Sequence, residues 1–172
     1  MAEPVVLDDV AVVRVTEANW RTYRDVRLAA LIDSPRAFWT TYPQAAERSD
    51  ERWLDLVVSG PATWLALDGG RPLGTVGLWH GPDQPEDVVA LIGMWVATVA
   101  RGAGVAELLV RTALRYAAAE GYARVVLDVA DENGRAGAFY ERLGFRATGA
   151  TGSMPWDRTV TERELALDLP VR

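Results

Sequence analysis

The sequence contains no cysteine, no lysine and only one histidine, His80. Without cysteine there are no disulfides, no thiolate metal ligands and no cysteine nucleophile. Without lysine there is no Schiff-base chemistry, and a nucleotide-triphosphate phosphate loop lacks its required lysine. A lone histidine supplies no ligand cluster, so we expect no metal site. His80 follows an expected strand and precedes a Gly-Pro loop, which favours a surface histidine over a catalytic base.

Long apolar runs and basic patches are also missing. No apolar stretch approaches the ~20 residues that a membrane span needs, and the acidic segment 1–9 does not resemble a secretory signal. We therefore predict a cytoplasmic protein without membrane contacts. The 18 arginines are scattered among 24 acidic residues, with a net charge of −6, so no nucleic-acid partner is expected. The negative field suits a cationic substrate, although it also serves solubility.

The composition is that of a globular protein, with 49% apolar residues in 172. This length fits one domain over 1–172 with a buried core. Alternating or continuous apolar patterns predict strands at 10–15, 63–67, 73–79, 88–96, 125–129, 145–148 and 163–169. Helical patterns cover 20–32, 45–58, 104–120 and about 136–143. The order predicts an α/β protein with a mixed sheet and helices on both faces.

A glycine turn joins the expected strand at 88–96 to the most regular helix. It reads Arg101-Gly102-Ala103-Gly104-Val105-Ala106. A helix N-terminus presents unpaired N–H groups and partial positive charge, and glycines let a phosphate approach the backbone. A dinucleotide fingerprint would need a third glycine where Glu107 stands. The remaining phosphate pattern is the coenzyme A cradle, Arg or Gln followed by x-x-Gly-x-Gly/Ala, and the alternative is a plain strand-to-helix connection.

Further segments make the chain similar to the GNAT superfamily of N-acetyltransferases. Met94-Trp95-Val96 with the glycine turn resembles the fourth strand and phosphate loop of that family. Asn133, Ala136, Phe139-Tyr140 and Gly144-Phe145 resemble its second cofactor motif, and Arg27-Leu28-Ala29-Ala30-Leu31 with Ser34-Pro35-Arg36-Ala37-Phe38 resembles its first helix and loop. The resemblance implies about seven strands, splayed between the fourth and fifth, and about four helices. It also implies acetyl-coenzyme A (acetyl-CoA) bound by Trp95, Val96, Ala97, Arg101, Gly102, Ala103, Gly104, Val105, Ala106, Asn133, Ala136, Phe139 and Tyr140.

The same resemblance suggests how an acetyl group would move. Without cysteine, an amine would attack the thioester directly, and the N–H of Val96 would polarise the acetyl carbonyl. Tyr140 is the candidate general acid, unless it is only a core tyrosine on a helix face. Asp128, in Leu127-Asp128-Val129, matches the Leu-Glu-Val of ribosomal-protein N-terminal acetyltransferases, whose glutamate is the base. An exposed or arginine-paired aspartate is the alternative, and the shorter side chain would need a bridging water.

The acceptor side is harder to predict from these residues. By resemblance, Phe38, Trp39, Tyr42 and Trp156 flank the acceptor opening, with Asp157 or Glu47 holding a cationic group. These aromatic residues would otherwise close the core. The acceptor is then a primary amine on a small molecule, peptide or protein, and homodimers are common in the family. A non-catalytic acetyl-CoA sensor of the same fold is the alternative function.

Overall fold

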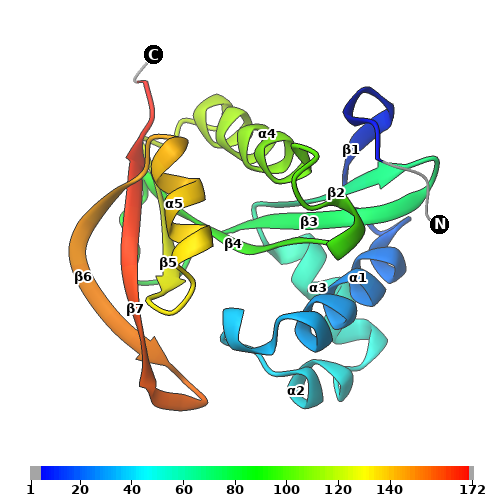
Figure 1. Ribbon diagram of the computed structural model, residues 1–172. Coiled ribbons are helices and arrows are strands. Elements are labelled where there is room, and N and C mark those ends of the chain that lie inside the picture. Colours follow the sequence, from blue (N-terminus) through cyan, green and yellow to red (C-terminus); the bar gives the residue numbers. More distant parts are fainter. Residues whose placement is uncertain (1–4, 171–172) are drawn as a thin grey trace.

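The computed structural model describes residues 5–170, which form one seven-stranded sheet with helices on both faces (Figure 1). The strand order is β1-β2-β3-β4-β5-β7-β6, and only the β4–β5 pair is parallel. The strands are β1 (Val10–Arg14), β2 (Ala62–Asp68), β3 (Arg71–Trp79), β4 (Val88–Val96), β5 (Arg124–Ala130), β6 (Arg146–Met154) and β7 (Asp157–Asp168). The α-helices are α1 (Trp20–Asp33), α2 (Tyr42–Ala46), α3 (Asp50–Ser59), α4 (Val105–Ala119) and α5 (Gly134–Arg142). Short 3-10 turns occupy Leu7–Asp9, Pro35–Ala37 and Thr98–Ala100.

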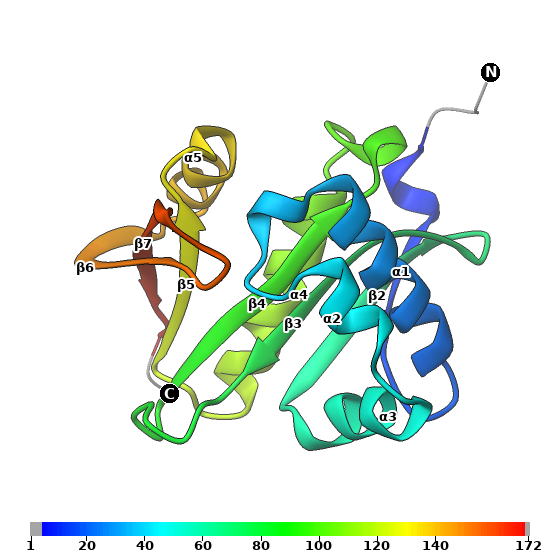
Figure 2. The same ribbon diagram turned by 90° about the horizontal axis from the view of Figure 1, so that it is seen from below.

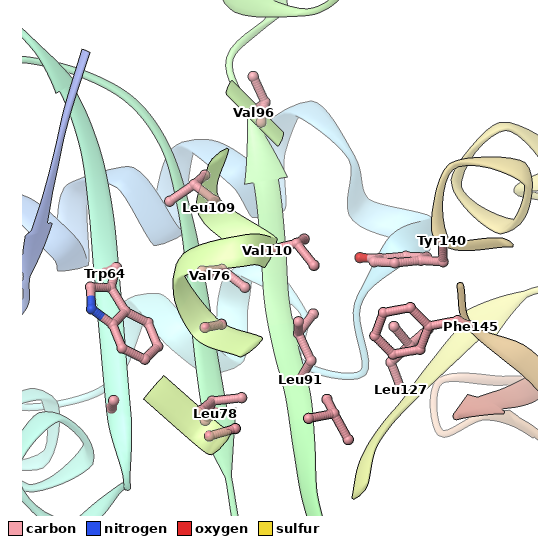
Figure 3. Close-up of a cluster of buried hydrophobic side chains, with 14 of the residues drawn as sticks. Trp64, Val76, Leu78, Leu91, Val96, Leu109, Val110, Leu127, Tyr140 and Phe145 are labelled. Carbon is pink, nitrogen blue, oxygen red and sulfur yellow. The ribbon is translucent and has the colours of Figure 1, made fainter. Parts of the chain in front are cut away.

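The two faces of the sheet carry separate hydrophobic clusters because side chains alternate along each strand. Helices α4 and α5 cover one face, where Trp64, Leu91, Val110 and Phe145 belong to the larger cluster (Figure 3). Helices α1, α2 and α3 cover the other face over a cluster that includes Leu65. The predicted mixed sheet with helices on both faces is thereby confirmed.

The sheet opens between β4 and β5, as the resemblance predicted. These strands pair only over Val88–Ala90 and Arg124–Val126, and they diverge beyond that point (Figure 2). The register of β4 against β3 shifts between Thr75 and Gly77, which pair with Trp95 and Ile92. Gly93 lies in this bulge with φ +62°, a conformation that glycine adopts without strain. The bulge bends β4, so its last residues turn away from β5.

The predicted helix over 45–58 is wrong in its extent, because two helices occupy the region. Thr41 and Gln44 form a capping box that starts α2. Ser49 then caps α3 by accepting a hydrogen bond from the Arg52 N–H (3.2 Å). These two N-terminal caps, eight residues apart, start two separate helices where the sequence pattern predicted one.

The C-terminal hairpin is also longer than predicted. Strand β6 continues to Met154 and β7 begins at Asp157, although we predicted strands only at 145–148 and 163–169. Seven consecutive residues of β6, from Arg146 to Gly152, are exposed. The strand is held by backbone pairing with β7 and buries little, so its sequence shows no apolar alternation.

Candidate active site

The glycine turn presents free backbone N–H groups toward a cleft. Gly102 and Gly104 have φ of +85° and +87°, in the left-handed region that favours glycine. Helix α4 begins at Val105 without a side-chain cap. Among the described residues, no backbone acceptor bonds the N–H groups of Gly104, Val105 or Ala106. These unpaired donors are the arrangement that binds phosphates at helix N-termini.

Gly104 is required here for two reasons that are visible in the structure. Its φ of +87° strains any residue with a Cβ, and an added Cβ would lie 3.1 Å from Leu7 Cδ2. A Cβ added to Gly102 would meet no atom within 4 Å. The steric constraint at Gly104 therefore comes from the segment before β1, in addition to any approach of a phosphate.

The Arg101 side chain forms a hydrogen bond and an ion pair with other residues of the protein. Its Nε donates to the Val96 carbonyl (3.0 Å), and its Nη2 pairs with Asp33 at the end of α1. Asp33 also accepts from Trp95 Nε1 (2.9 Å) and Ser34 Oγ (2.7 Å). These hydrogen bonds, that of Trp95 above all, and the nearby guanidinium hold the pKa of Asp33 at about 2. The positive charge of Arg101 is thus already compensated by a carboxylate that lies 68 residues earlier in the chain.

The cleft lies between the end of β4, the start of α4 and helix α5, and its volume is about 650 Å³. Many of the predicted cofactor residues line it: Trp95, Val96, Arg101, Gly102, Gly104, Ala106, Asn133, Ala136, Phe139 and Tyr140. Ala97, Ala103 and Val105 do not belong to the lining, and Val105 is a fully buried core residue. Asn133 Oδ1 accepts from the Ala136 N–H (3.2 Å), so it caps α5 at the rim of the cleft.

Sequence reasoning missed three arginines at this cleft, Arg111, Arg135 and Arg142. Arg111 pairs with Glu107, whereas Arg135 and Arg142 form no ion pair among residues 5–170. Their spacing of seven residues, two helical turns, places both on one side of α5. That spacing beside the predicted cofactor motif was the signal that could have identified them.

The backbone of β4 is free on the side that faces the opening. The Ala97 N–H donates to the Leu73 carbonyl in β3 (2.8 Å). Because successive N–H groups of an extended strand point to opposite sides, the Val96 N–H points away from β3. The Val96 carbonyl accepts from Arg101. The N–H of Val96 is therefore aimed at the gap between β4 and β5, where a ligand carbonyl could accept from it.

Tyr140 lines the cleft and packs in the core at the same time. It is 7% exposed, with its ring centroid 5.1 Å from that of Phe139 and 5.6 Å from that of Phe145. Figure 3 shows its hydroxyl pointing from α5 toward β4. No hydrogen bond of this hydroxyl occurs in the part of the chain that the structure describes. Burial raises the pKa of Tyr140 well above its ordinary value, so the phenol remains a proton donor at neutral pH.

Asp128 lies outside the cleft lining, on β5. Its neighbours Leu127 and Val129 are buried in the cluster that contains Tyr140, so the alternating Asp128 side chain emerges on the opposite face of the sheet. Desolvation, and then the carboxylates of Glu162 and Glu164, raise the pKa of Asp128 to about 6. It forms no ion pair with an arginine among the described residues. A carboxylate with this pKa can accept a proton near neutral pH.

The segment 35–41, which we call the strap, runs from the end of α1 toward the C-terminal strands (Figure 2). Trp156 Nε1 donates to the Phe38 carbonyl (2.8 Å), and Trp39 Nε1 donates to the buried carboxylate of Glu162 (2.9 Å). Arg36 binds Glu132 through two hydrogen bonds of 2.7 and 3.0 Å. These contacts join the loop after α1 to the β5–α5 loop, the β6–β7 turn and β7 across the opening of the sheet.

The predicted acceptor residues therefore differ in their positions. Phe38 lines the cleft and is 7% exposed in the core of the α1 face, whereas Trp39 and Tyr42 are 54% and 40% exposed. Trp39, Tyr42 and Trp156 do not line the cleft. Asp157 accepts hydrogen bonds from Thr159, which lower its pKa. Neither Asp157 nor Glu47 lines the cleft.

Residues 5–170 contain no group of three histidine, cysteine or acidic side chains positioned to hold a metal ion. His80 Nε2 lies 3.1 Å from the Pro85 carbonyl in the loop before β4, and His80 does not line the cleft. None of the helices within residues 5–170 has both the length and the apolarity to cross a membrane.

Comparison with known proteins identifies the family to which this site belongs. A sequence profile described as the acetyltransferase (GNAT) family matches residues 15–145, from the residue after β1 to just beyond α5. The chain belongs to the GNAT acetyltransferase family. Human N-acetyltransferase 8B is 35% identical over 127 residues, which cover 71% of this chain and 56% of that protein. The chain thus spans a little over half the length of this curated GNAT relative.

Solved GNAT structures share the fold. An N-acetyltransferase from Staphylococcus aureus Mu50 superposes with a TM-score of 0.78 at 17% identity, over 94% of this chain and 99% of that one. The Salmonella typhimurium protein yncA, solved with its cofactor acetyl-CoA, has a TM-score of 0.76 at 16% identity and 95% coverage of both chains. At this identity the likeness concerns the fold alone.

Proposed function

We propose that this protein is an N-acetyltransferase that moves an acetyl group from acetyl-CoA to a primary amine. One observation carries the proposal: a single cleft joins the unpaired N–H groups at the start of α4 to the free hydroxyl of Tyr140. The first is suited to a pyrophosphate and the second to a leaving thiolate. Membership of the GNAT family supports the same activity.

The residues of the cleft fit acetyl-CoA by their chemistry. The backbone of Gly104 to Ala106 would bind the pyrophosphate, and Arg135 and Arg142 on α5 would meet the outer phosphate charge. Because Arg101 is bound to Asp33 and to the Val96 carbonyl, its proposed task is to fix the turn. The bound cofactor supplies the activated acetyl group, and the Val96 N–H would donate to its carbonyl oxygen.

The proposed acid and base lie on opposite faces of the sheet. An acetyl group in the gap between β4 and β5 would have Tyr140 on the α5 face and Asp128 on the α1 face. The amine nitrogen would form a bond to the acetyl carbon, and Asp128 would take the proton of the amine through a water. The carbon–sulfur bond would then break, and the coenzyme A thiolate would leave beside the Tyr140 hydroxyl. With its pKa raised, the Tyr140 hydroxyl would act first as a hydrogen-bond donor to the departing sulfur.

A sensor that binds acetyl-CoA without turnover is the second candidate. The exposed position of Asp128 outside the cleft lining favours it, because a general base must reach the amine. The pKa of about 6 for Asp128 and the unpartnered Tyr140 hydroxyl favour the enzyme. Neither candidate requires a metal.

The deciding experiment is incubation with acetyl-CoA and a panel of amines, with free thiol measured over time. The enzyme predicts thiol release that depends on one or more amines and continues over many turnovers. The sensor predicts acetyl-CoA binding by calorimetry with no release above the rate of hydrolysis. If acetyl-CoA neither binds nor is consumed, both candidates are wrong.

A further inference from the structure

Arg27 on α1 has no anionic or hydrogen-bonding partner for its guanidinium among residues 5–170. Its Nη1 is shielded from solvent and has no hydrogen-bond partner, and it is the only buried side-chain polar atom of this kind among residues 5–170. No other hydrogen bond or ion pair of this guanidinium occurs in the same part of the chain. Nine of the 17 arginines in residues 5–170 pair with carboxylates, and Arg27 differs from the unpaired others in having a guanidinium nitrogen that is buried.

The surroundings of Arg27 include the Phe38 ring, the Tyr23 phenol and a second arginine, Arg48. Its guanidinium carbon lies 4.3 Å from the centroid of the Phe38 ring, and a Cβ added to Gly93 in the bulge of β4 would lie 3.6 Å from Nη1. Desolvation lowers the pKa of Arg27, the Tyr23 phenol raises it, and the nearby Arg48 lowers it further. Arg48 also forms no ion pair among the described residues. Two neighbouring arginines therefore have no ion pair with a carboxylate in the part of the chain that the structure describes.

This position adjoins the acceptor side of the cleft. Phe38, which stacks on Arg27, lines the cleft, and so does Met94, the residue after Gly93. A buried guanidinium without a counter-ion is costly, because arginine stays protonated and loses its hydration. The planar fork of donors matches the two oxygens of a carboxylate. A ligand that brings a carboxylate to this point would gain the contacts that the protein itself does not supply.

We propose that Arg27 binds a carboxylate of the acceptor, so the amine that is acetylated belongs to a molecule that also carries a carboxylate group. The inference rests on the proposed acetyl transfer and specifies the class of its acceptor. Phe38 lies between the cleft and the guanidinium, and the ring would shift to let the carboxylate reach the donors. A free amino acid or an amino-acid conjugate has the required pair of groups.

Matched acceptors test the proposal on the full chain. L-Phenylalanine, L-phenylalaninamide and 2-phenylethylamine share an aromatic body, and only the first carries a carboxylate. The same comparison is made for a set of other L-amino acids and their amides. For at least one set, we expect kcat/KM for the acid to exceed that for the amide by about 10- to 100-fold, the range of a hydrogen bond to a charged group. In Arg27→Met this ratio should fall to about one.

A control and a stability readout separate recognition from a structural role. Arg24 lies on the same helix and pairs with Asp25 and Asp50, so Arg24→Met should leave the acid-to-amide ratio as it is. Arg27→Met removes an uncompensated cation and should melt at the same temperature as the natural protein or higher. A clear fall in melting temperature together with an unchanged ratio would overturn the proposal.

Simple anion binding gives an independent result if no amine is acetylated. Formate should raise the melting temperature of the natural protein above that in chloride of equal ionic strength, and it should not do so for Arg27→Met. Thiol release with neutral amines and no preference for carboxylates would refute the inference while sustaining the acetyltransferase. Absence of acetyl-CoA binding together with formate protection at Arg27 would refute the acetyltransferase and keep the anion site.

Discussion

Replacing Asp128 with asparagine should make the protein more stable at neutral pH and far less active. The carboxylate pKa is raised to about 6 in the folded protein from an ordinary value of 3.8. Folding therefore favours the protonated form. This stabilisation is fully present below pH ~4 and is lost as the pH rises through ~6. Above this range Asp128 is ionised, and this charge lowers the free energy of unfolding. Asparagine has the same shape and never carries the charge.

The size of the effect follows from the pKa and from the exposure of the side chain. A rise from 3.8 to about 6 corresponds to at most about 3 kcal/mol in the free energy of unfolding. Asp128 is exposed to solvent on β5, and screening reduces the contribution of exposed charges severalfold. We therefore expect Asp128→Asn to gain roughly 1 kcal/mol above pH 7, which is about 2–4 °C in melting temperature for a chain of this size.

Two measurements on the same variant test the reasoning. Scanning calorimetry at pH 8 and pH 4.5 should show the full gain at pH 8 and only about a third of it at pH 4.5, because the pKa is 3.8 in the unfolded chain and about 6 in the folded protein. Acetyl transfer should fall by about 10²–10⁴-fold, because the amide cannot accept a proton. In the natural protein, kcat/KM should decline as the pH falls through about 6. A variant with near-normal turnover and the same melting temperature at both pH values would show that Asp128 is an ordinary surface residue.

Three further changes address the cleft. Tyr140→Phe should lower turnover by about 10²–10⁴-fold with little change in acetyl-CoA affinity, and near-normal turnover at saturating substrate would leave Tyr140 as a core residue only. Gly104→Ala should lower both acetyl-CoA affinity, measured by calorimetry, and stability by about 1 kcal/mol, because of φ +87° and the nearby Leu7; unchanged affinity would remove the phosphate cradle. Arg135→Ser with Arg142→Ser should weaken coenzyme A binding severalfold at low salt, and the loss should shrink as ionic strength rises; equal affinity across salt would separate these arginines from the phosphates.

Features that depend on neighbouring residues could be predicted from the sequence. Helix α4 shows its apolar period clearly, and Gly121 follows its end. The strand, glycine turn and helix around Gly102 and Gly104 occupy consecutive residues, so local pattern was enough to suggest a phosphate cradle. The confirmed opening between β4 and β5 came from the resemblance to the GNAT family and not from any local pattern.

Features that join distant segments could not be predicted in this way. Arg101 reads as a free cation in sequence, but it is neutralised by Asp33, which only the packing of α1 against the end of β4 brings near. The lack of a hydrogen-bond partner for Arg27 Nη1 also cannot be predicted from the sequence, because it depends on where the fold places the carboxylates of distant residues. Sequence also merged α2 with α3, since the cap at Ser49 lies inside a continuous helical pattern. The role of Asp128 stays a prediction.

The short pairing of β4 with β5 divides the sheet into two parts, β1–β4 and β5–β7. Backbone pairing joins the two parts only at Val88–Ala90 and Arg124–Val126. At the other end the strap joins them through the hydrogen bonds of Trp39 to Glu162 and of Trp156 to the Phe38 carbonyl. A ligand bound between these two connections would contact both parts of the sheet and would restrict their motion relative to each other. Acetyl-CoA binding should thus slow hydrogen exchange in the strap, which lines the cleft, and together with it in β5, which does not.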